Sequence, residues 1–198
     1  ADRFLREIEV AANLSHPHIL ALFDSGEAEG LLYYAMPYVE GESLRDKLTR
    51  EGQLPIEEAL RIAREVADAL SHAHGHDIIH RDIKPENILL SGGHALVADF
   101  GIARAVGQTG GERLTETGLA VGTAAYMSPE QASGERQLDG RSDIYSLGCV
   151  LYEMLVGAPP FVGPSGRALL AQHAIDPVLP IRTRRATVAP SLEQAVLK

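Results

Sequence analysis

Apolar side chains at helical spacing predict two long helices. Residues 56–73 place an apolar side chain at every third or fourth position, and Pro55 followed by two glutamates suits the start of a helix. Residues 142–155 are apolar on nearly every side, so the second helix is expected to be buried. It should end before Pro159.

Weaker patterns predict shorter helices at both ends of the chain and near its first quarter. Residues 4–12, 165–174 and 190–198 each read as helical stretches. Ser43 is a candidate N-cap for a further short helix, because Asp46 stands three residues on, in the capping-box position.

Two pairs of short apolar runs predict strands. Ile19 to Phe23 and Leu31 to Met36 are separated by residues 24–26, whose composition is that of a turn, and they read as a strand pair. Ile88 to Leu90 and Ala95 to Ala98 are linked by two glycines, which is a hairpin signal.

These elements predict an α+β chain with a β-rich beginning and a mainly helical remainder. Residues 101–140 are rich in Gly, Thr and Ser and are poor in apolar periodicity, so we expect a long loop there that is either functional or mobile. The sequence shows no internal repeat and no low-complexity linker.

Composition narrows the class of protein. The 198 residues carry a net charge of −9, which argues against a nucleic-acid partner, since phosphate contacts need clustered Lys and Arg. No run of roughly 18 apolar residues exists, so we expect no membrane contact from this segment. The lone cysteine, Cys149, fits a reducing compartment and a cytoplasmic location, and its apolar surroundings favour a buried packing role.

Three polar motifs follow one another at His80–Asn87, Asp99–Gly101 and Ser128–Glu130. Any one of them could occur by chance, but all three in this order resemble the catalytic loop, the metal-binding loop and the end of the activation segment of protein kinases. The resemblance, to bacterial eukaryotic-like serine/threonine kinases, implies a partial small lobe at 1–38, with a helix and two strands. A mainly helical large lobe at 39–198 follows.

The resemblance implies catalytic or metal-binding roles for five residues. Asp82 would orient the acceptor hydroxyl, and Lys84 would reach the transferred phosphate. Thr123 would bond the catalytic aspartate and shape the acceptor pocket. Asn87 and Asp99 would supply hard oxygen ligands for Mg²⁺, with Mn²⁺ as a possible substitute. Without the family context, Asp and Asn in loops commonly cap or turn the chain.

The same resemblance implies an ATP site. Met36, Pro37 and Val39 correspond to the hinge between lobes, where the Pro37 carbonyl and the Val39 amide would pair with adenine. Leu89 would lie beneath the ring, and it can serve as a core residue as well. Glu7 would pair with the ATP-contacting lysine; its alternative is a solvated charge on a helix.

Several residues are expected to support the site. His80, Phe100 and Ala11 match positions where the family stacks side chains between the lobes, so His80 is interpreted as a packing and hydrogen-bonding residue. Asp143 either holds the backbone of the catalytic loop or caps its own helix. His72 and His76 have the spacing of helical zinc ligands, but the metalloprotease Glu is absent, so we interpret them as a helix end.

Arg81 and two threonines suggest regulation. An Arg before the catalytic Asp marks, in this family, kinases whose activation loop is ordered by a phosphate. Thr115 and Thr117 resemble the paired loop threonines of bacterial kinases, so we expect autophosphorylation there, with a kinase–kinase dimer as a possible route.

The chain also departs from the family pattern. Its lysines are Lys47, Lys84 and Lys198, so neither the ATP-contacting lysine nor a Gly-rich loop precedes Glu7. We therefore expect a chain truncated at both ends, weak or inactive by itself, from a parent that can be membrane-anchored elsewhere. Glu130 is expected to lack its downstream arginine and to be an unpaired buried carboxylate.

Two functions remain open from the sequence. One is ATP-dependent phosphorylation of protein Ser/Thr hydroxyls. The other is a pseudokinase-like nucleotide-binding or scaffold module, or an inactive fragment. Retention of Asp82, Lys84, Asn87 and Asp99 favours the kinase, because a scaffold needs none of them.

Overall fold

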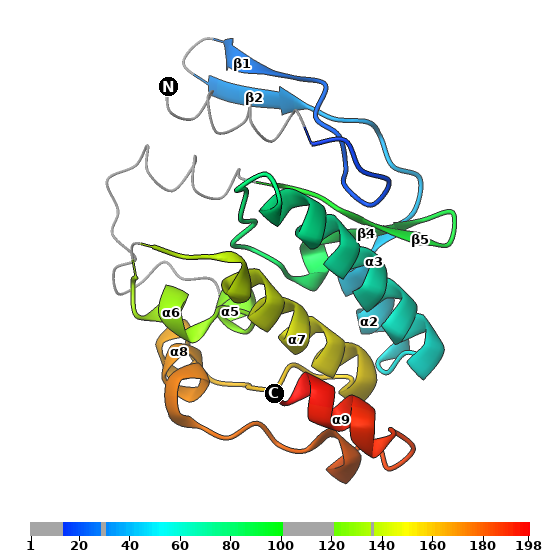
Figure 1. The fold of residues 1–198 in the computed structure, drawn as a ribbon, viewed down its shortest axis with the longest axis vertical. Helices are drawn as coiled ribbons and strands as arrows, with labels where there is room; N and C mark the ends of the chain where they lie inside the picture. Colours follow the sequence, from blue (N-terminus) through cyan, green and yellow to red (C-terminus); the bar gives the residue numbers. More distant parts are fainter. Residues whose placement is uncertain (1–13, 29–30, 101–120, 136) are drawn as a thin grey trace.

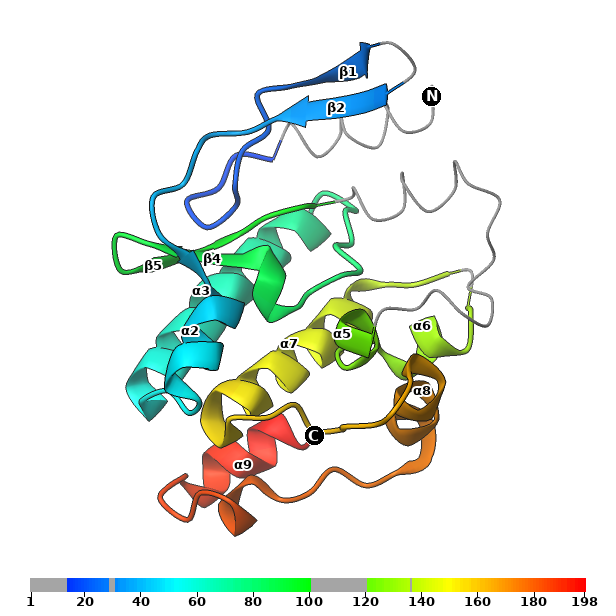
Figure 2. The ribbon, with the colours of Figure 1, turned by 180° about the vertical axis from the view of Figure 1, so that it is seen from behind.

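A small β-hairpin part lies over a larger, mostly helical part in the computed structural model, which describes residues 14–28, 31–100, 121–135 and 137–198 (Figure 1). A three-stranded sheet lies between the hairpin and most of the helices, as the view from behind also shows (Figure 2). The α+β fold expected from the sequence is confirmed.

The hairpin pairs β1 (Asp24–Ala28) with β2 (Leu31–Ala35) in antiparallel register, with Asp24 opposite Ala35. The predicted first strand, residues 19–23, and the predicted turn, residues 24–26, are therefore wrong. Pairing with β2 overrides the turn preference of these polar residues, because strand formation depends on the partner more than on local composition. Ile19 is buried instead and forms a parallel bridge with Val97.

The three-stranded sheet has the order β3–β4–β5, and all its pairings are antiparallel. It consists of β3 (Glu42–Ser43), β4 (Ile88–Ser91) and β5 (His94–Val97). Gly92 and Gly93 connect β4 to β5 with φ of 57° and 84°, so the predicted glycine hairpin is confirmed.

The two long predicted helices are confirmed as α3 (Ile56–His74) and α7 (Gly140–Val156), which pack against each other. The apolar face of α3 is buried, as its periodicity predicts. Ile144 of α7 is 53% exposed, however, so the second helix is not buried on every side.

The short helix α2 (Leu44–Glu51) begins with the predicted capping box, in which the Ser43 side chain and Asp46 bond each other's backbone N–H groups. The predicted helices near the end of the chain appear as α8 (Gly166–Ile175) and α9 (Pro190–Val196). Two 3₁₀ turns, η1 (Pro85–Asn87) and η2 (Ile181–Thr183), complete this part.

The stretch expected to be a long loop contains two short helices. These are α5 (Val121–Ala124) and α6 (Pro129–Ala132). Each spans four residues, which is too short to give a periodic signal, and this explains why the sequence pattern missed them. Ser128 caps α6 through a capping box with Gln131.

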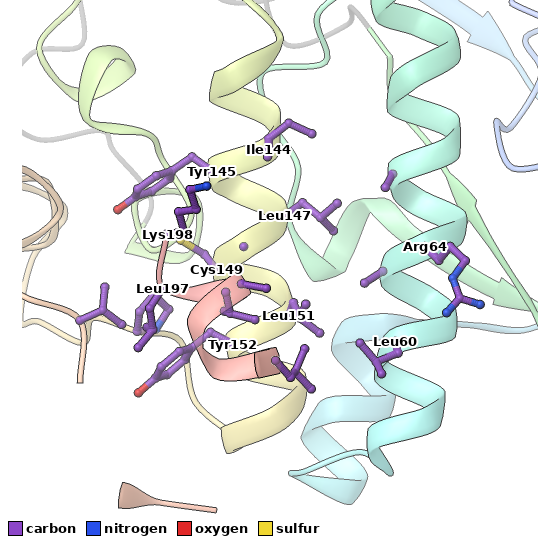
Figure 3. A pocket seen from close by; sticks show the side chains of 18 residues that line it. Leu60, Arg64, Ile144, Tyr145, Leu147, Cys149, Leu151, Tyr152, Leu197 and Lys198 are labelled. Carbon is purple, nitrogen blue, oxygen red and sulfur yellow. The ribbon is translucent and has the colours of Figure 1, made fainter. Parts of the chain in front are cut away.

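An apolar cavity of about 660 Å³ lies among α3, α7 and α9. Figure 3 shows its lining side chains, among them Leu60 of α3 and Leu151 of α7. Cys149 also lines it and is buried, as expected, and burial raises the pKa of its thiol to about 12. Because none of the described residues of the polar motifs lines this cavity, we place the candidate chemistry elsewhere.

Within the described residues, no helix combines the length and the apolar character needed to cross a membrane.

Candidate active site

Four of the predicted catalytic and metal-binding side chains meet around Asp82. The Lys84 ammonium donates to Asp82 Oδ2 at 2.7 Å and to Thr123 Oγ1 at 3.2 Å. The Asn87 amide donates to Asp82 Oδ2 at 3.1 Å and to the Asp82 carbonyl at 2.8 Å. A catalytic-loop carboxylate is thus bonded to a cation and an amide, with a hydroxyl from α5 beside them.

Asp99 lies within electrostatic reach of this cluster. It follows β5, and the neighbouring Ala98 N–H donates to the Asn87 carbonyl at 2.9 Å, which ties the two loops together. Burial raises the pKa of the Asp99 carboxyl, and the negative charge of Asp82 raises it further. The backbone of Asp99 has φ of 65°, a conformation that non-glycine residues rarely adopt.

Asp143 holds the backbone of the catalytic loop. Its buried carboxylate accepts the N–H of His80 at 2.8 Å, the N–H of Arg81 at 2.7 Å and a ring nitrogen of His74 at 2.8 Å. The helix N-cap is Asp139, which accepts the Arg141 N–H at 2.9 Å. The first of the two interpretations of Asp143 is therefore correct.

These bonds stabilise a strained backbone. Arg81 has φ of 70°, which costs an L-residue roughly 1–2 kcal/mol, and the two adjacent N–H groups converge on one carboxylate as a result. The Arg81 carbonyl accepts the Gln131 amide at 2.7 Å, so α6 holds the same residue from the other side.

His80 is a packing and hydrogen-bonding residue, as expected. Its Nδ1 accepts the Asp82 N–H at 3.2 Å, so Nε2 carries the proton and donates to the Ala98 carbonyl at 2.8 Å. Its ring meets the Phe100 ring edge-on at 4.6 Å between centroids. Burial lowers the pKa of His80, which keeps the imidazole neutral.

The candidate hinge residues Met36, Pro37 and Val39 lie in the segment that links β2 to β3. Leu89 lies on β4 opposite Leu96, and it is partly buried. Glu7, Ala11, Thr115 and Thr117 lie outside the described residues.

The expectation of an unpaired Glu130 is wrong. The Ser142 hydroxyl donates to Glu130 Oε1 at 2.6 Å. Burial by itself would raise the pKa of Glu130. The hydrogen bond from the Ser142 hydroxyl is the largest of the contributions that outweigh burial, so the pKa is lowered.

His76, just after the end of α3, forms a hydrogen bond with that helix. Its Nδ1 lies 2.8 Å from the His72 carbonyl oxygen.

Sequence reasoning missed an ionic network built on Arg45. Its guanidinium bonds Glu86, within the His80–Asn87 motif, and Glu153 of α7. Arg45 lies in the first turn of a charged helix, where the sequence pattern predicts a solvated side chain. Only its contacts in the folded structure identify it as the centre of an ionic network.

Comparisons with known proteins agree with this geometry. The family model described as "Protein kinase domain" matches residues 1–194. The serine/threonine-protein kinase PknB of Mycolicibacterium smegmatis is 49% identical over 99% of this chain and 32% of its own length. PknB of Mycobacterium leprae is 45% identical over the same shares. The chain thus spans about a third of the length of these curated relatives.

A solved structure is similar as well. The crystal structure of a variant of the Mycobacterium tuberculosis PknI kinase domain matches with a TM-score of 0.75 and 33% identity, over 99% of this chain and 68% of that one. With the family model matched along nearly the whole sequence and the motif side chains gathered around Asp82, this chain belongs to the protein kinase domain family, in its bacterial, eukaryotic-like serine/threonine branch.

Proposed function

We propose that the protein transfers the γ-phosphate of ATP to serine or threonine hydroxyls of other proteins. The observation that carries the proposal is the convergence of Lys84 and Asn87 on one oxygen of Asp82. Both bonds use Oδ2, so Oδ1 is the oxygen available to an acceptor hydroxyl. A fixed carboxylate with one oxygen aimed at the substrate suits a residue that orients the hydroxyl and takes its proton.

Lys84 and Thr123 have roles beside Asp82. The Lys84 ammonium carries positive charge next to the acceptor position, where charge on the transferred phosphoryl group would be compensated. The Thr123 hydroxyl bonds the same ammonium and thereby holds α5 against the catalytic loop. As the acceptor oxygen bonds to phosphorus and the bond to the leaving diphosphate breaks, the acceptor proton moves to Asp82.

The donor set fits a magnesium–nucleotide complex. The Asn87 amide nitrogen is bonded to Asp82, which leaves the amide oxygen as the atom for a cation, and the Asp99 carboxylate is a hard oxygen donor. When bound, Mg²⁺ neutralises phosphate charge, and Mn²⁺ suits the same ligands. The Pro37 carbonyl and Val39 N–H are proposed to bind adenine, with Met36 beside them and Leu89 beneath the ring, and Glu7 is proposed to pair with the ATP-contacting lysine.

The lobe boundary is proposed near residue 38, where the chain leaves the hairpin part.

We also propose that Thr115 and Thr117 become phosphorylated through a kinase–kinase contact, and that the phosphate group pairs with the Arg81 side chain. Hydrogen bonds from the Arg81 N–H to Asp143 and from the Gln131 amide to the Arg81 carbonyl fix the position of the Arg81 backbone, from which the side chain extends.

Phosphate transfer from γ-³²P-labelled ATP to a protein acceptor tests the proposal on the full-length protein. Asp82→Asn is expected to lower kcat by roughly a hundredfold or more, because the substituted amide cannot take the proton. Asp139→Asn is the matched control, since Asn also caps helices well and Asp139 lies outside the cluster. ATP binding without transfer by the wild-type protein would instead support the scaffold function.

A further inference from the structure

Arg45 joins two carboxylates that come from different parts of the chain. Its Nε donates to Glu86 Oε1 at 2.8 Å, and its Nη1 donates to Glu153 Oε1 at 2.8 Å. Glu86 belongs to η1, next to the catalytic Asn87, and Glu153 lies on α7. One guanidinium from α2 therefore occupies an acidic pair that two other elements form.

The Glu153 carboxylate has little capacity left for another donor. Its second oxygen accepts the Tyr126 hydroxyl at 2.5 Å and lies 3.4 Å from Arg45 Nη2, which also donates to Tyr126. The Glu153 side chain is 5% exposed, whereas those of Arg45 and Glu86 are 30% and 40% exposed. The acidic pair thus reaches the surface, but Arg45 fills its inner part.

A cavity of about 250 Å³ lies beside this network. Its polar lining is Arg45, Glu86, Tyr126 and Glu153, and its apolar lining includes Phe161, Val162 and Leu169. Val162 is 71% exposed, so apolar surface continues to the cavity mouth.

The cavity lies next to the candidate acceptor site. Gly122 and Ala125, on either side of Thr123, line it. A smaller cavity lined by Asp82 and Thr123 shares Tyr126 with it. A polypeptide whose hydroxyl reaches Asp82 would therefore pass over the Arg45 cavity with a nearby side chain.

We infer that Arg45 determines substrate specificity: by occupying the Glu86–Glu153 pair, it makes the adjoining cavity a site for an uncharged, apolar side chain of the protein substrate and a poorer site for a basic one than the bare acidic pair would be. The inference rests on the proposed function. Removing Arg45 would leave two carboxylates facing the cavity without their cation, which is a site for a substrate arginine or lysine.

The test compares matched acceptor peptides that carry Leu, Ala, Glu or Arg at each position around one threonine. We expect the wild-type protein to have its highest kcat/KM with Leu at one position. In Arg45→Ala, the ratio of kcat/KM for the Arg peptide to that for the Leu peptide at this position should rise by about tenfold or more, the contribution of a charge-assisted hydrogen bond.

Two further variants keep the result interpretable. Arg45→Ala combined with Glu153→Gln removes the buried charge that would be left unpaired, so it protects the fold, and it should still raise the ratio through Glu86, by a smaller factor. Arg50→Ala is the matched control on α2, because Arg50 bonds Glu42 and Glu51 and does not line the cavity. It should leave the ratio unchanged.

Peptide binding, measured by fluorescence anisotropy without ATP, separates this inference from the proposed function. If no protein variant transfers phosphate but Arg45→Ala still gains affinity for the Arg peptide, the proposed function fails and the Arg45 site stands. If transfer proceeds and the Arg-to-Leu ratio is the same in wild type, Arg45→Ala and the double variant, the inference is overturned.

Discussion

At the scale of single residues, the buried carboxylate of Asp143 fixes the backbone of the loop that carries the candidate catalytic side chains. Asp143→Ala should lower the free energy of unfolding by about 3–5 kcal/mol, because the N–H groups of His80 and Arg81 lose their acceptor inside the protein. Urea unfolding followed by circular dichroism measures this change. Asp139→Ala, at the exposed start of the same helix, should cost only about 1 kcal/mol. Equal losses in both variants would contradict the role of Asp143.

Residue contacts were predictable where the partners are close in the sequence. Asp82, Lys84 and Asn87 lie within one short loop, so their motif already brought them together. Arg45 and Glu153 are 108 positions apart. No periodicity relates such positions, and each residue type is ordinary on a helix, so this pair could be found only from the fold.

At the scale of secondary-structure elements, the β4–β5 hairpin depends on two glycines with positive φ. Apart from the glycine and its two neighbours in the chain, no atom of the described residues lies within 4 Å of a Cβ built at Gly92 or Gly93, so a substitution there changes mainly backbone strain. Gly93→Val should lower the free energy of unfolding by roughly 1–2 kcal/mol, because a β-branched residue resists φ of 84°. Gly92→Asn should change it by less than about 0.5 kcal/mol, since Asn tolerates this region. Similar losses in both variants, measured by urea unfolding, would exclude strain as the cause.

Elements were predictable where the local signal and the tertiary contacts agree. Helix α3 has a regular apolar face that packs on α7, and the β4–β5 turn has the glycines that its geometry requires. Strand β1 is the opposite case, because its polar residues indicate a turn and only pairing with β2 makes them a strand. Helices α5 and α6 are single turns whose position near the catalytic loop comes from contacts such as Lys84 with Thr123.

At the scale of the whole molecule, three histidines in distant places should make stability depend on pH. Burial lowers the pKa of His16, before the β1–β2 hairpin, of His80 in the catalytic loop and of His173 on α8. In the unfolded chain each titrates near its ordinary value of about 6.5, so below that pH the unfolded state binds more protons than the folded state. The free energy of unfolding should therefore fall as the pH is lowered.

The size of this effect follows from the number of protons. His80 and His173 can each contribute up to about 1.4 kcal/mol for every pH unit between the unfolded and the folded pKa, and His16 contributes less, because the Asp68 carboxylate beside it opposes the effect of burial on its pKa. Urea unfolding at about pH 7.5, 6.5 and 5.5 covers a window in which most carboxyl groups stay ionised. His173→Gln, which can keep a polar partner for the Tyr145 hydroxyl, should reduce the slope by removing one of the three groups. A stability that stayed constant or rose toward pH 5.5 would show that the three rings take up protons without unfolding, so that their burial does not control the charge of the folded protein.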